Sequence, residues 1–397
     1  MYDVIIVGAG PGGASTAYFL GEAGQRVLVL EKATLPRYKT CGGGLSTQML
    51  DKYFPFSFDP VIESRSNAIA YALGDQLITV PLPRHPISMV MRDRFDAYLL
   101  AHAQAEVRQG VAVRSVLERA DRVIVEAADG KSYEARYLIG ADGANSIVAQ
   151  SVGLRRGKTL VAAIEAEVPA PPEMLSRFAA APLFIFSEIG LGYLWIFPKA
   201  DHLSVGVAAL HPKPGELQVT LRRVMARYDI LLDGVPLHGH PVPVYTRHER
   251  IATARTLLVG DAAGLADPLS GEGIRLAIKS GQLAARAIVS GQPGQYPKMV
   301  FQKIGLCHIF GLVLAQIFYR FPHTCFALGV RNPFASRAFM DLLSDRIDLP
   351  GVMLRLFSSL PVYLLAEGVA RLIGKWGGTQ RQQRFRSLIY SVGETQT

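Results

Sequence analysis

The stretch that decides the fold is Tyr2–Gly13, which reads YDVIIVGAGPGG. Its apolar half, Tyr2–Val7, predicts a buried parallel strand, because such strands read as continuous hydrophobic runs. The glycine-rich half leads into an alanine-rich helical stretch that reaches Ala23, and a second apolar strand is expected over Arg26–Leu30. Strand, glycine turn, helix and strand in this order predict a Rossmann-type α/β unit.

The glycines of this unit have the spacing GxGxxG. Gly8 permits the tight turn, Gly10 lets the backbone approach a pyrophosphate, and Gly13 lets the helix pack closely on the strand. Glu31 ends the second strand, where its carboxylate is placed to accept hydrogen bonds from ribose hydroxyls and to repel a 2′-phosphate. These features together predict a dinucleotide site.

Composition limits the kinds of partner that we expect. The chain has 397 residues, 49% of them hydrophobic and 19% charged, and a net charge of +9, so we expect a globular multidomain enzyme. No nucleic-acid-binding motif accompanies the positive charge, which favours a phosphate-bearing ligand or an anionic membrane over nucleic acid. Cys41, Cys307 and Cys325 form no CxxC pair, and no signal peptide is expected, so we expect a cytoplasmic protein.

Two later glycine motifs distinguish FAD from NAD. Each follows a short apolar strand, Arg136–Gly140 or Thr256–Gly260, and each places an aspartate, Asp142 or Asp261, at the carboxyl end of that strand. Either aspartate taken alone also fits a turn or a helix N-cap. Together with the fingerprint they favour FAD.

The set GAGPGG, GADGANS and LLVGDAAGLADPLSGEGI resembles the p-hydroxybenzoate hydroxylase class of glutathione-reductase-type flavoproteins. The resemblance implies that Glu31 holds the ribose, that Arg92 lies near the phosphates, and that Asp261 contacts the ribityl or pyrophosphate portion. It also implies a loop facing the isoalloxazine ring. The other cofactor contacts that we expect are Ala14, Lys32, Val116, Asp142, Gly271, Gly273 and Ile274.

Two further segments, YKTCGGGLS at 38–46 and GYLWIFP at 192–198, resemble the geranylgeranyl reductase family. That resemblance implies a Cys41 loop beside the flavin, with Gly42 and Gly44 admitting the ring, and an isoprenoid pocket lined by the aromatic strand. Cys41 also fits a small buried residue. Gly190 departs from the family, which often has proline there.

Tyr193, Trp195 and Phe197 alternate along their predicted strand and so project from one face. The same face would suit a packed core as well as a pocket wall. The resemblance to the geranylgeranyl reductase family implies saturation of isolated alkenes by hydride from reduced flavin. We expect catalytic roles for Cys41, Tyr193 and Trp195, with the Tyr193 hydroxyl as a hypothetical proton donor.

The expected fold is α/β, with an inserted antiparallel-sheet domain and a helical C-terminal region. The predicted FAD-binding domain comprises 1–60, 90–160 and 250–295, and the substrate domain 61–89 and 161–249. A C-terminal region, 296–397, follows.

Within the C-terminal region the uncharged run Ile304–Tyr319 is short for a membrane span, which predicts a buried or interfacial helix. Pro350 and Pro361 are expected to break the helical pattern of Phe339–Leu365. The basic segment Arg371–Arg386, with Trp376, suits peripheral contact with an anionic inner membrane face, or a solvated tail.

Several alternatives remain open at this point. The scaffold would also suit an FAD monooxygenase, or a membrane-associated flavoprotein that passes electrons to a quinone. No second GxGxxG unit supplies a nicotinamide domain, which leaves NAD(P)H and ferredoxin, and so an electron-donor protein, as candidate reductants. The spacing of the nine histidines predicts no metal site.

Overall fold

The fingerprint segment forms the centre of a parallel sheet. The computed structural model describes residues 1–82 and 86–391. In it, the glycine turn joins the central strand to α1 (Pro11–Glu22). The parallel strands follow in the order β8 (Glu106–Gln109), β2 (Val27–Glu31), β1 (Tyr2–Val7), β11 (Ser132–Gly140) and β17 (Thr256–Leu258). Their carboxyl ends share one edge, where open α/β sheets bind ligands.

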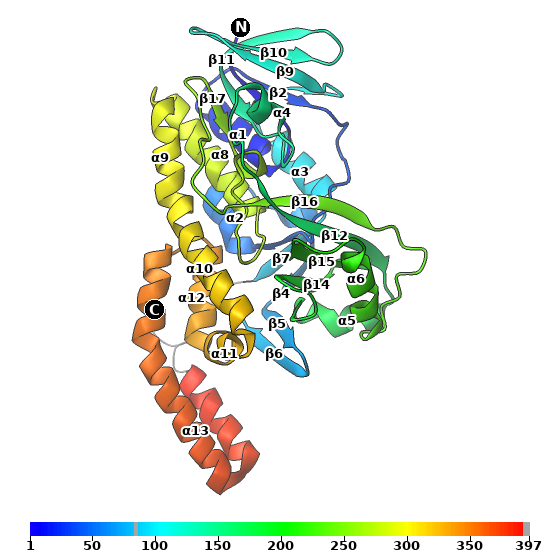
Figure 1. Cartoon of the computed structure of the whole chain (residues 1–397), viewed down its shortest axis with the longest axis vertical. Coiled ribbons are helices and arrows are strands. Elements are labelled where there is room, and N and C mark those ends of the chain that lie inside the picture. The colour runs from blue at the N-terminus through cyan, green and yellow to red at the C-terminus, as the bar shows by residue number, and fades with distance from the viewer. Residues whose placement is uncertain (83–85, 392–397) are drawn as a thin grey trace.

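Two helices pack closely beside this sheet (Figure 1). α8 (Ile274–Val289) lies against α1, and a Cβ on Gly281 would come within 2.7 Å of the Ser15 hydroxyl and 2.9 Å of the Gly12 carbonyl oxygen. The crossing therefore requires a residue without a side chain. The sheet is extended on its other side by an antiparallel hairpin of β9 (Val113–Glu118) and β10 (Val123–Ala127).

A second sheet contains the aromatic strand. Its strands follow in the order β16 (His238–Val244), β12 (Thr159–Pro169), β15 (His202–Leu210), β14 (Gly192–Pro198), β13 (Leu183–Phe186), β5 (Ala68–Leu73) and β6 (Gln76–Pro81). All neighbours are antiparallel except β13 and β5, which run parallel. The expected antiparallel sheet is therefore present, with one parallel pair where β5 enters from a distant part of the chain.

The two faces of β14 have different neighbours. Leu194 and Ile196 pack with α5 (Pro172–Ala179) and α6 (Glu216–Ala226) in one core cluster. The side chains of Tyr193, Trp195 and Phe197 belong to a separate cluster on the opposite face. The predicted alternation is therefore present.

Short elements join the two large sheets. They comprise a small sheet of β3 (Gly44–Ser46), β7 (Ile87–Val90) and β4 (Ile62–Ser66), and the helices α2 (Thr47–Tyr53), α3 (Arg92–Ala101), α4 (Ile147–Ser151) and α7 (Gly260–Ala263).

The C-terminal region is helical, as expected, but its breaks are placed differently. Pro293–Arg320 forms one helical stretch of 28 residues. It is longer than the uncharged run Ile304–Tyr319, since the helix continues through Lys303. The helical pattern is interrupted before Pro350, since α12 (Pro333–Leu343) ends there and α13 (Leu349–Ser391) begins with that proline in its first turn. Pro361 lies inside α13 without ending it, so the expected break at Pro361 is wrong. The chain instead departs from helical geometry at Gly378, where φ is 78°. Its C-terminal elements are α9 (Tyr296–Val300), α10 (Leu306–Arg320), α11 (Pro322–Cys325), α12 (Pro333–Leu343) and α13 (Leu349–Ser391).

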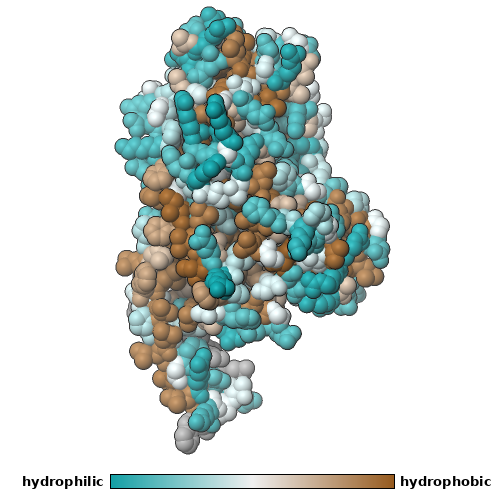
Figure 2. All heavy atoms as spheres, in the orientation of Figure 1, coloured by the Kyte–Doolittle hydropathy of each residue, from teal (hydrophilic) through white to brown (hydrophobic). Residues whose placement is uncertain are grey.

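Apolar side chains cover the outer side of these helices, where Figure 2 shows a brown band along the C-terminal part of the molecule. The side chains of α10 that contribute to this surface are Leu306, Ile309, Phe310, Val313 and Ile317, and those of α13 are Leu354, Phe357, Val362, Leu365, Val369 and Leu372. We call this set the apolar C-terminal surface. The side chain of Trp376 lies outside the described residues.

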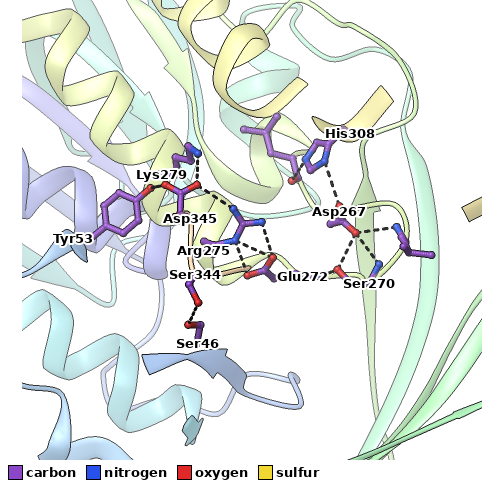
Figure 3. A network of polar contacts seen from close by, with 12 residues as sticks. Ser46, Tyr53, Asp267, Ser270, Glu272, Arg275, Lys279, His308, Ser344 and Asp345 are labelled. Atoms are coloured by element: carbon purple, nitrogen blue, oxygen red, sulfur yellow. Dashed lines mark hydrogen bonds and ion pairs between the residues drawn. The ribbon is translucent and has the colours of Figure 1, made fainter. Parts of the chain in front are cut away.

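One aspartate fastens the C-terminal helices to the FAD-binding half (Figure 3). Asp345 follows α12 and accepts hydrogen bonds from Lys52 at 2.9 Å and Tyr53 at 2.8 Å. Its other carboxylate oxygen pairs with Lys279 and with Arg275, both in α8. Burial opposes the charge of Asp345, but these cations outweigh it and lower its pKa to about 2.

We expect Asp345→Asn to lower the free energy of unfolding by about 2 kcal/mol at pH 7, since a pKa shift of this size is a stability contribution. The carboxylate stabilises the fold above its unfolded pKa of about 3.8, and the contribution is lost as pH falls toward 2. Urea unfolding at several pH values would measure it. Asp233→Asn, whose side chain is 94% exposed, is the control. Equal stability of the two variants at pH 7 would contradict this role.

Candidate functional site

The glycine turn after β1 has the geometry of a phosphate cradle. Gly8 has a φ of +100°, and a Cβ on Gly13 would overlap the Gly8 carbonyl oxygen, so both positions need glycine. Gly10 faces more open space, where the nearest atoms that a Cβ would meet are guanidinium nitrogens of Arg37 and Arg92, each 3.9 Å away. At Gly10 no side chain therefore lies between the backbone and the guanidinium groups of Arg37 and Arg92.

Both guanidinium groups are held by one buried carboxylate. Asp96 lies one turn after Arg92 in α3 and accepts from its Nε at 2.8 Å and from its Nη2 at 2.9 Å. Arg37 donates to the same carboxylate at 3.0 Å. Burial disfavours the charge of Arg92, but Asp96 outweighs it and raises the pKa of Arg92.

Within the part of the chain that the structure describes, this cluster keeps a hydrogen-bond donor free, although Arg37 also lies 3.9 Å from Glu31. Nη1 of Arg37 is buried and has no hydrogen-bond partner among the described residues. Nearby, Lys39 pairs with His240; burial lowers the pKa of Lys39 to about 8 and that of His240 to about 4. An anion such as a pyrophosphate would accept from this free donor of Arg37.

The other predicted cofactor contacts lie in several different elements of the FAD-binding half. Glu31 is buried at the end of β2 and accepts from the backbone N–H groups of Ala9 at 2.7 Å and Ala33 at 3.0 Å. Ala14 is buried in α1, and Lys32 is exposed. Val116 is buried in β9 opposite Val125, and it packs within the core.

The two later aspartates differ in their surroundings. Asp142 accepts from the Ser146 hydroxyl at 2.5 Å and from the backbone N–H of Val148 at 3.1 Å, so it orders the turn before α4. Asp261 opens α7, and burial raises its pKa against the opposing charges of Lys39 and Arg92. Its carboxylate lies beside Gly273.

The cysteine-glycine loop, Cys41–Gly44, lies directly on the aromatic face of β14. A Cβ on Gly42 would come within 3.0 Å of both Trp195 Nε1 and the Phe197 ring, and one on Gly44 within 3.2 Å of the same ring. Two segments that lie about 150 residues apart, and that the sequence links only by a family resemblance, therefore meet in space. Their contact leaves no room for side chains.

The aromatic strand also contacts the loop before α8. Tyr193 donates its hydroxyl proton to the Ser270 carbonyl oxygen, and Gly271, with a φ of +69°, lies against that hydroxyl. Ile274 begins α8 directly after Gly273. The expected isoalloxazine loop and the expected substrate strand therefore lie next to each other.

Sequence reasoning missed several residues of the site. Arg37 and Asp96 are among them, although Asp96 lies four residues after Arg92 and that spacing was a usable signal. Glu165 is fully buried in β12 and accepts from the Tyr38 hydroxyl at 2.7 Å and from the Cys41 N–H at 2.8 Å. An acid inside the apolar run TLVAAIEAEVP was the available signal for it.

Lys199 was also missed. It is buried, and its ammonium donates to the carbonyl oxygens of Gly42 at 2.7 Å and Val90 at 2.9 Å. Burial lowers its pKa. Lys199 thereby fixes the cysteine-glycine loop against the small sheet.

Comparison with known proteins agrees with this geometry. A family model described as an FAD binding domain matches residues 1–295. Geranylgeranyl diphosphate reductase of Oryza sativa subsp. japonica is 32% identical, over 72% of this chain and 66% of the rice protein. Menaquinone reductase of Mycobacterium tuberculosis is 28% identical, over 86% of this chain and 92% of that protein.

Solved structures share the fold. A geranylgeranyl bacteriochlorophyll reductase-like protein of Thermoplasma acidophilum has a TM-score of 0.76 at 23% identity, covering 91% of this chain and 96% of that one. A flavin-dependent brominase has a TM-score of 0.71 at 19% identity, and the match covers both chains completely. With the family match over residues 1–295, these relatives show that the chain belongs to the geranylgeranyl reductase family of FAD-dependent oxidoreductases.

Proposed function

We propose that the protein is a reductase that saturates isolated double bonds of a prenyl chain. The observation that carries this proposal is the contact of the Cys41–Gly44 loop with Trp195 and Phe197, beside the loop that contains Gly271. An apolar aromatic wall next to the expected flavin position suits a hydrocarbon chain better than a polar substrate.

The residues around the cradle fit FAD. The carboxylate of Glu31 keeps lone pairs for ribose hydroxyls after accepting from two backbone N–H groups. Arg37 and Arg92 would hold the pyrophosphate above Gly10, and the Gly271–Ile274 loop would face the ring. Reduced FAD supplies a hydride, and the chain's own residues position the alkene and exclude water.

The same scaffold leaves two other functions to test. A monooxygenase would need oxygen and would release a hydroxylated product, and an electron carrier would reduce a quinone without saturating any alkene. The aromatic face of β14, together with the glycines that lie on it, favours the reductase. The names of the rice and mycobacterial relatives, which are a prenyl diphosphate reductase and a menaquinone reductase, support the same class of substrate.

We expect the dithionite-reduced protein, kept anaerobic, to add two hydrogen atoms per double bond to geranylgeranyl diphosphate or to a prenylated quinone. Mass spectrometry of the extracted product would measure the gain. Dithionite replaces NAD(P)H or ferredoxin, so the result does not depend on the natural donor. Hydroxylated product after admission of oxygen, or flavin oxidation without any saturated product, would refute the proposal.

We expect Arg37→Met to weaken FAD binding about 10- to 100-fold, since a charge-assisted hydrogen bond contributes about 1.5–3 kcal/mol. Titration of the flavin-free protein with FAD, followed by flavin fluorescence, would measure the dissociation constant. Arg94→Met is the matched control, because Arg94 pairs with Glu63 and its side chain is 55% exposed. Unchanged FAD affinity in Arg37→Met would refute the pyrophosphate role.

We also propose that the apolar C-terminal surface docks on an anionic membrane. Two helical stretches, Pro293–Arg320 and Pro350–Lys375, are long and apolar enough to cross a bilayer by length and composition. Each nevertheless keeps one face in protein: Tyr296 and Ile304 are buried in the core of the FAD-binding half, and Ala370 is fully buried. Contact along one face suits an interfacial helix better than a spanning one.

Exposed cations flank this surface, namely Arg320, Arg371, Lys375 and Arg381. Basic residues beside an apolar helix face favour anionic lipid. A surface-bound enzyme could take a prenylated substrate from the bilayer without releasing it into water.

We expect the double variant Leu354→Glu/Leu365→Glu to lose at least tenfold in binding to anionic vesicles, because it places two charges on side chains that are 71% and 72% exposed in the apolar C-terminal surface. Cosedimentation at low salt with phosphatidylglycerol vesicles would measure this loss. Leu231→Glu, at a position that is 69% exposed in the other half of the molecule, is the control. Equal binding of both variants would contradict membrane docking.

A further inference from the structure

Two buried polar atoms beside the cysteine-glycine loop lack partners. They are Oε2 of Glu165 and Nε1 of Trp195, and neither has a hydrogen bond within 1–82 and 86–391. The Glu165 oxygen accepts hydrogen bonds when the carboxyl is charged and can donate when it is protonated, whereas the Trp195 nitrogen only donates. An unpaired polar atom inside a protein is costly, so a pair of them at one place points to a bound molecule.

Glu165 lies on the face of its sheet that carries the aromatic residues. Ala163, two residues earlier in β12, belongs to the same cluster as Trp195 and Phe197, whereas Ile164 belongs to the cluster behind the sheet. The Oε1 atom of Glu165 already accepts hydrogen bonds from the Tyr38 hydroxyl and the Cys41 N–H. Oε2 remains for a ligand.

Trp195 reaches toward this carboxyl across the intervening strand. Gly206 of β15 pairs with Glu165 on one side and with Trp195 on the other, so the three positions form one row across the sheet. A Cβ on Gly206 would overlap the indole and would lie 2.6 Å from its Cε2, the atom bonded to Nε1. The indole N–H edge therefore lies above Gly206, roughly one strand spacing of 4.8 Å from the strand of Glu165.

The groups that face Glu165 come from every neighbouring element. They are Tyr38 and Cys41 in the loop, Glu167 in its own strand, Lys199 after β14, and His238, its register partner in β16. Burial is the largest influence and raises the pKa of Glu165 to about 7, with Glu167 acting in the same direction and Tyr38 against it. At neutral pH this carboxyl exchanges a proton readily.

We propose that Glu165 supplies the proton of the reduction, through a water molecule held between its free oxygen and the indole N–H of Trp195. The inference rests on the proposed function. Saturation of one double bond adds a hydride, which brings both electrons, to one carbon and a proton to the other. The carboxyl of Glu165 loses that proton as the new C–H bond forms, and the carboxylate regains one from solvent.

Tyr193, whose hydroxyl the sequence suggests for this step, is less suited to it. Its hydroxyl proton is already donated to the Ser270 carbonyl oxygen, and burial raises its pKa further from neutrality. Glu165 has the opposite properties, with a free oxygen and a proton that is exchangeable near pH 7.

The ionisation of Glu165 can be followed without turnover. Trp195 and Trp376 are the two tryptophans of the chain, so Trp376→Phe leaves Trp195 as a single reporter. In this background we expect the fluorescence of Trp195 to change with a midpoint near pH 7, and Glu165→Gln to abolish the change. The midpoint should rise in Tyr38→Phe and fall in Glu167→Gln, since Tyr38 lowers the pKa of Glu165 and Glu167 raises it. A transition that persists in Glu165→Gln would overturn the assignment.

The proton transfer itself is tested in single turnovers of prenyl substrate by dithionite-reduced protein. We expect the rate to fall as pH rises through about 7, because the protonated carboxyl is the active form. Glu165→Gln should be roughly 100-fold slower and insensitive to pH there, with partial recovery in Glu165→Asp. Glu165→Gln should bind FAD with the affinity of the parent protein. This control shows that the slower rate comes from the missing proton donor and not from a damaged fold.

The outcomes separate the two proposals. If the parent protein saturates no alkene, the proposed function fails, whatever the fluorescence shows. If it does saturate alkenes, and Glu165→Gln does so at the parental rate with the parental pH profile, the proton role of Glu165 is wrong while the reductase remains.

Discussion

The close contact between a backbone loop and an aromatic strand is the constraint on which the rest of the site depends. Gly42 and Gly44 leave Trp195 and Phe197 in direct contact with the main chain, and a Cβ on Gly43 would overlap the Val90 carbonyl oxygen. The ammonium of Lys199 donates to the Gly42 carbonyl oxygen of this loop and to the Val90 carbonyl oxygen of β7, so it joins the loop to the small sheet. A side chain at Gly43 would collide with the main chain, and one at Gly42 or Gly44 would press on the aromatic rings.

This contact also brings together two electrostatic environments of opposite character. On one side, Arg37 and Arg92 share the carboxylate of Asp96, Lys39 lies nearby, and a buried Arg37 donor stays free within the described residues. On the other, Trp195 and Phe197 form an aromatic face, and burial favours the neutral form of Glu165 on the same face of the sheet. The first environment suits pyrophosphate and the second suits hydrocarbon, and Cys41 lies between them.

The sequence predicted most of the fold because the fold depends on local patterns. Gly8, Gly10 and Gly13 have a fixed relation to the strand and helix on either side, and the alternation of Tyr193, Trp195 and Phe197 is visible within seven residues. The Arg37–Asp96 pair and the contacts of Glu165 join residues 59 and more than 120 positions apart, and no local pattern specifies such pairs. Pro361 was misjudged because a proline disfavours a helix interior, yet α13 continues through this position.

The C-terminal helices connect the proposed membrane surface to the site by ordinary packing. In α10, the buried side of the helix carries His308, which contacts the Leu265 carbonyl oxygen at 2.9 Å and lies 3.5 Å from Asp267. Asp267 in turn accepts from the backbone N–H of Ser270 (Figure 3). The carbonyl oxygen of Ser270 accepts from the Tyr193 hydroxyl. The other side of α10 carries part of the apolar C-terminal surface. Because a packed helix moves as a unit, a contact that holds α10 in place would also restrain the loop of Asp267 and Ser270 on which the Tyr193 hydroxyl rests.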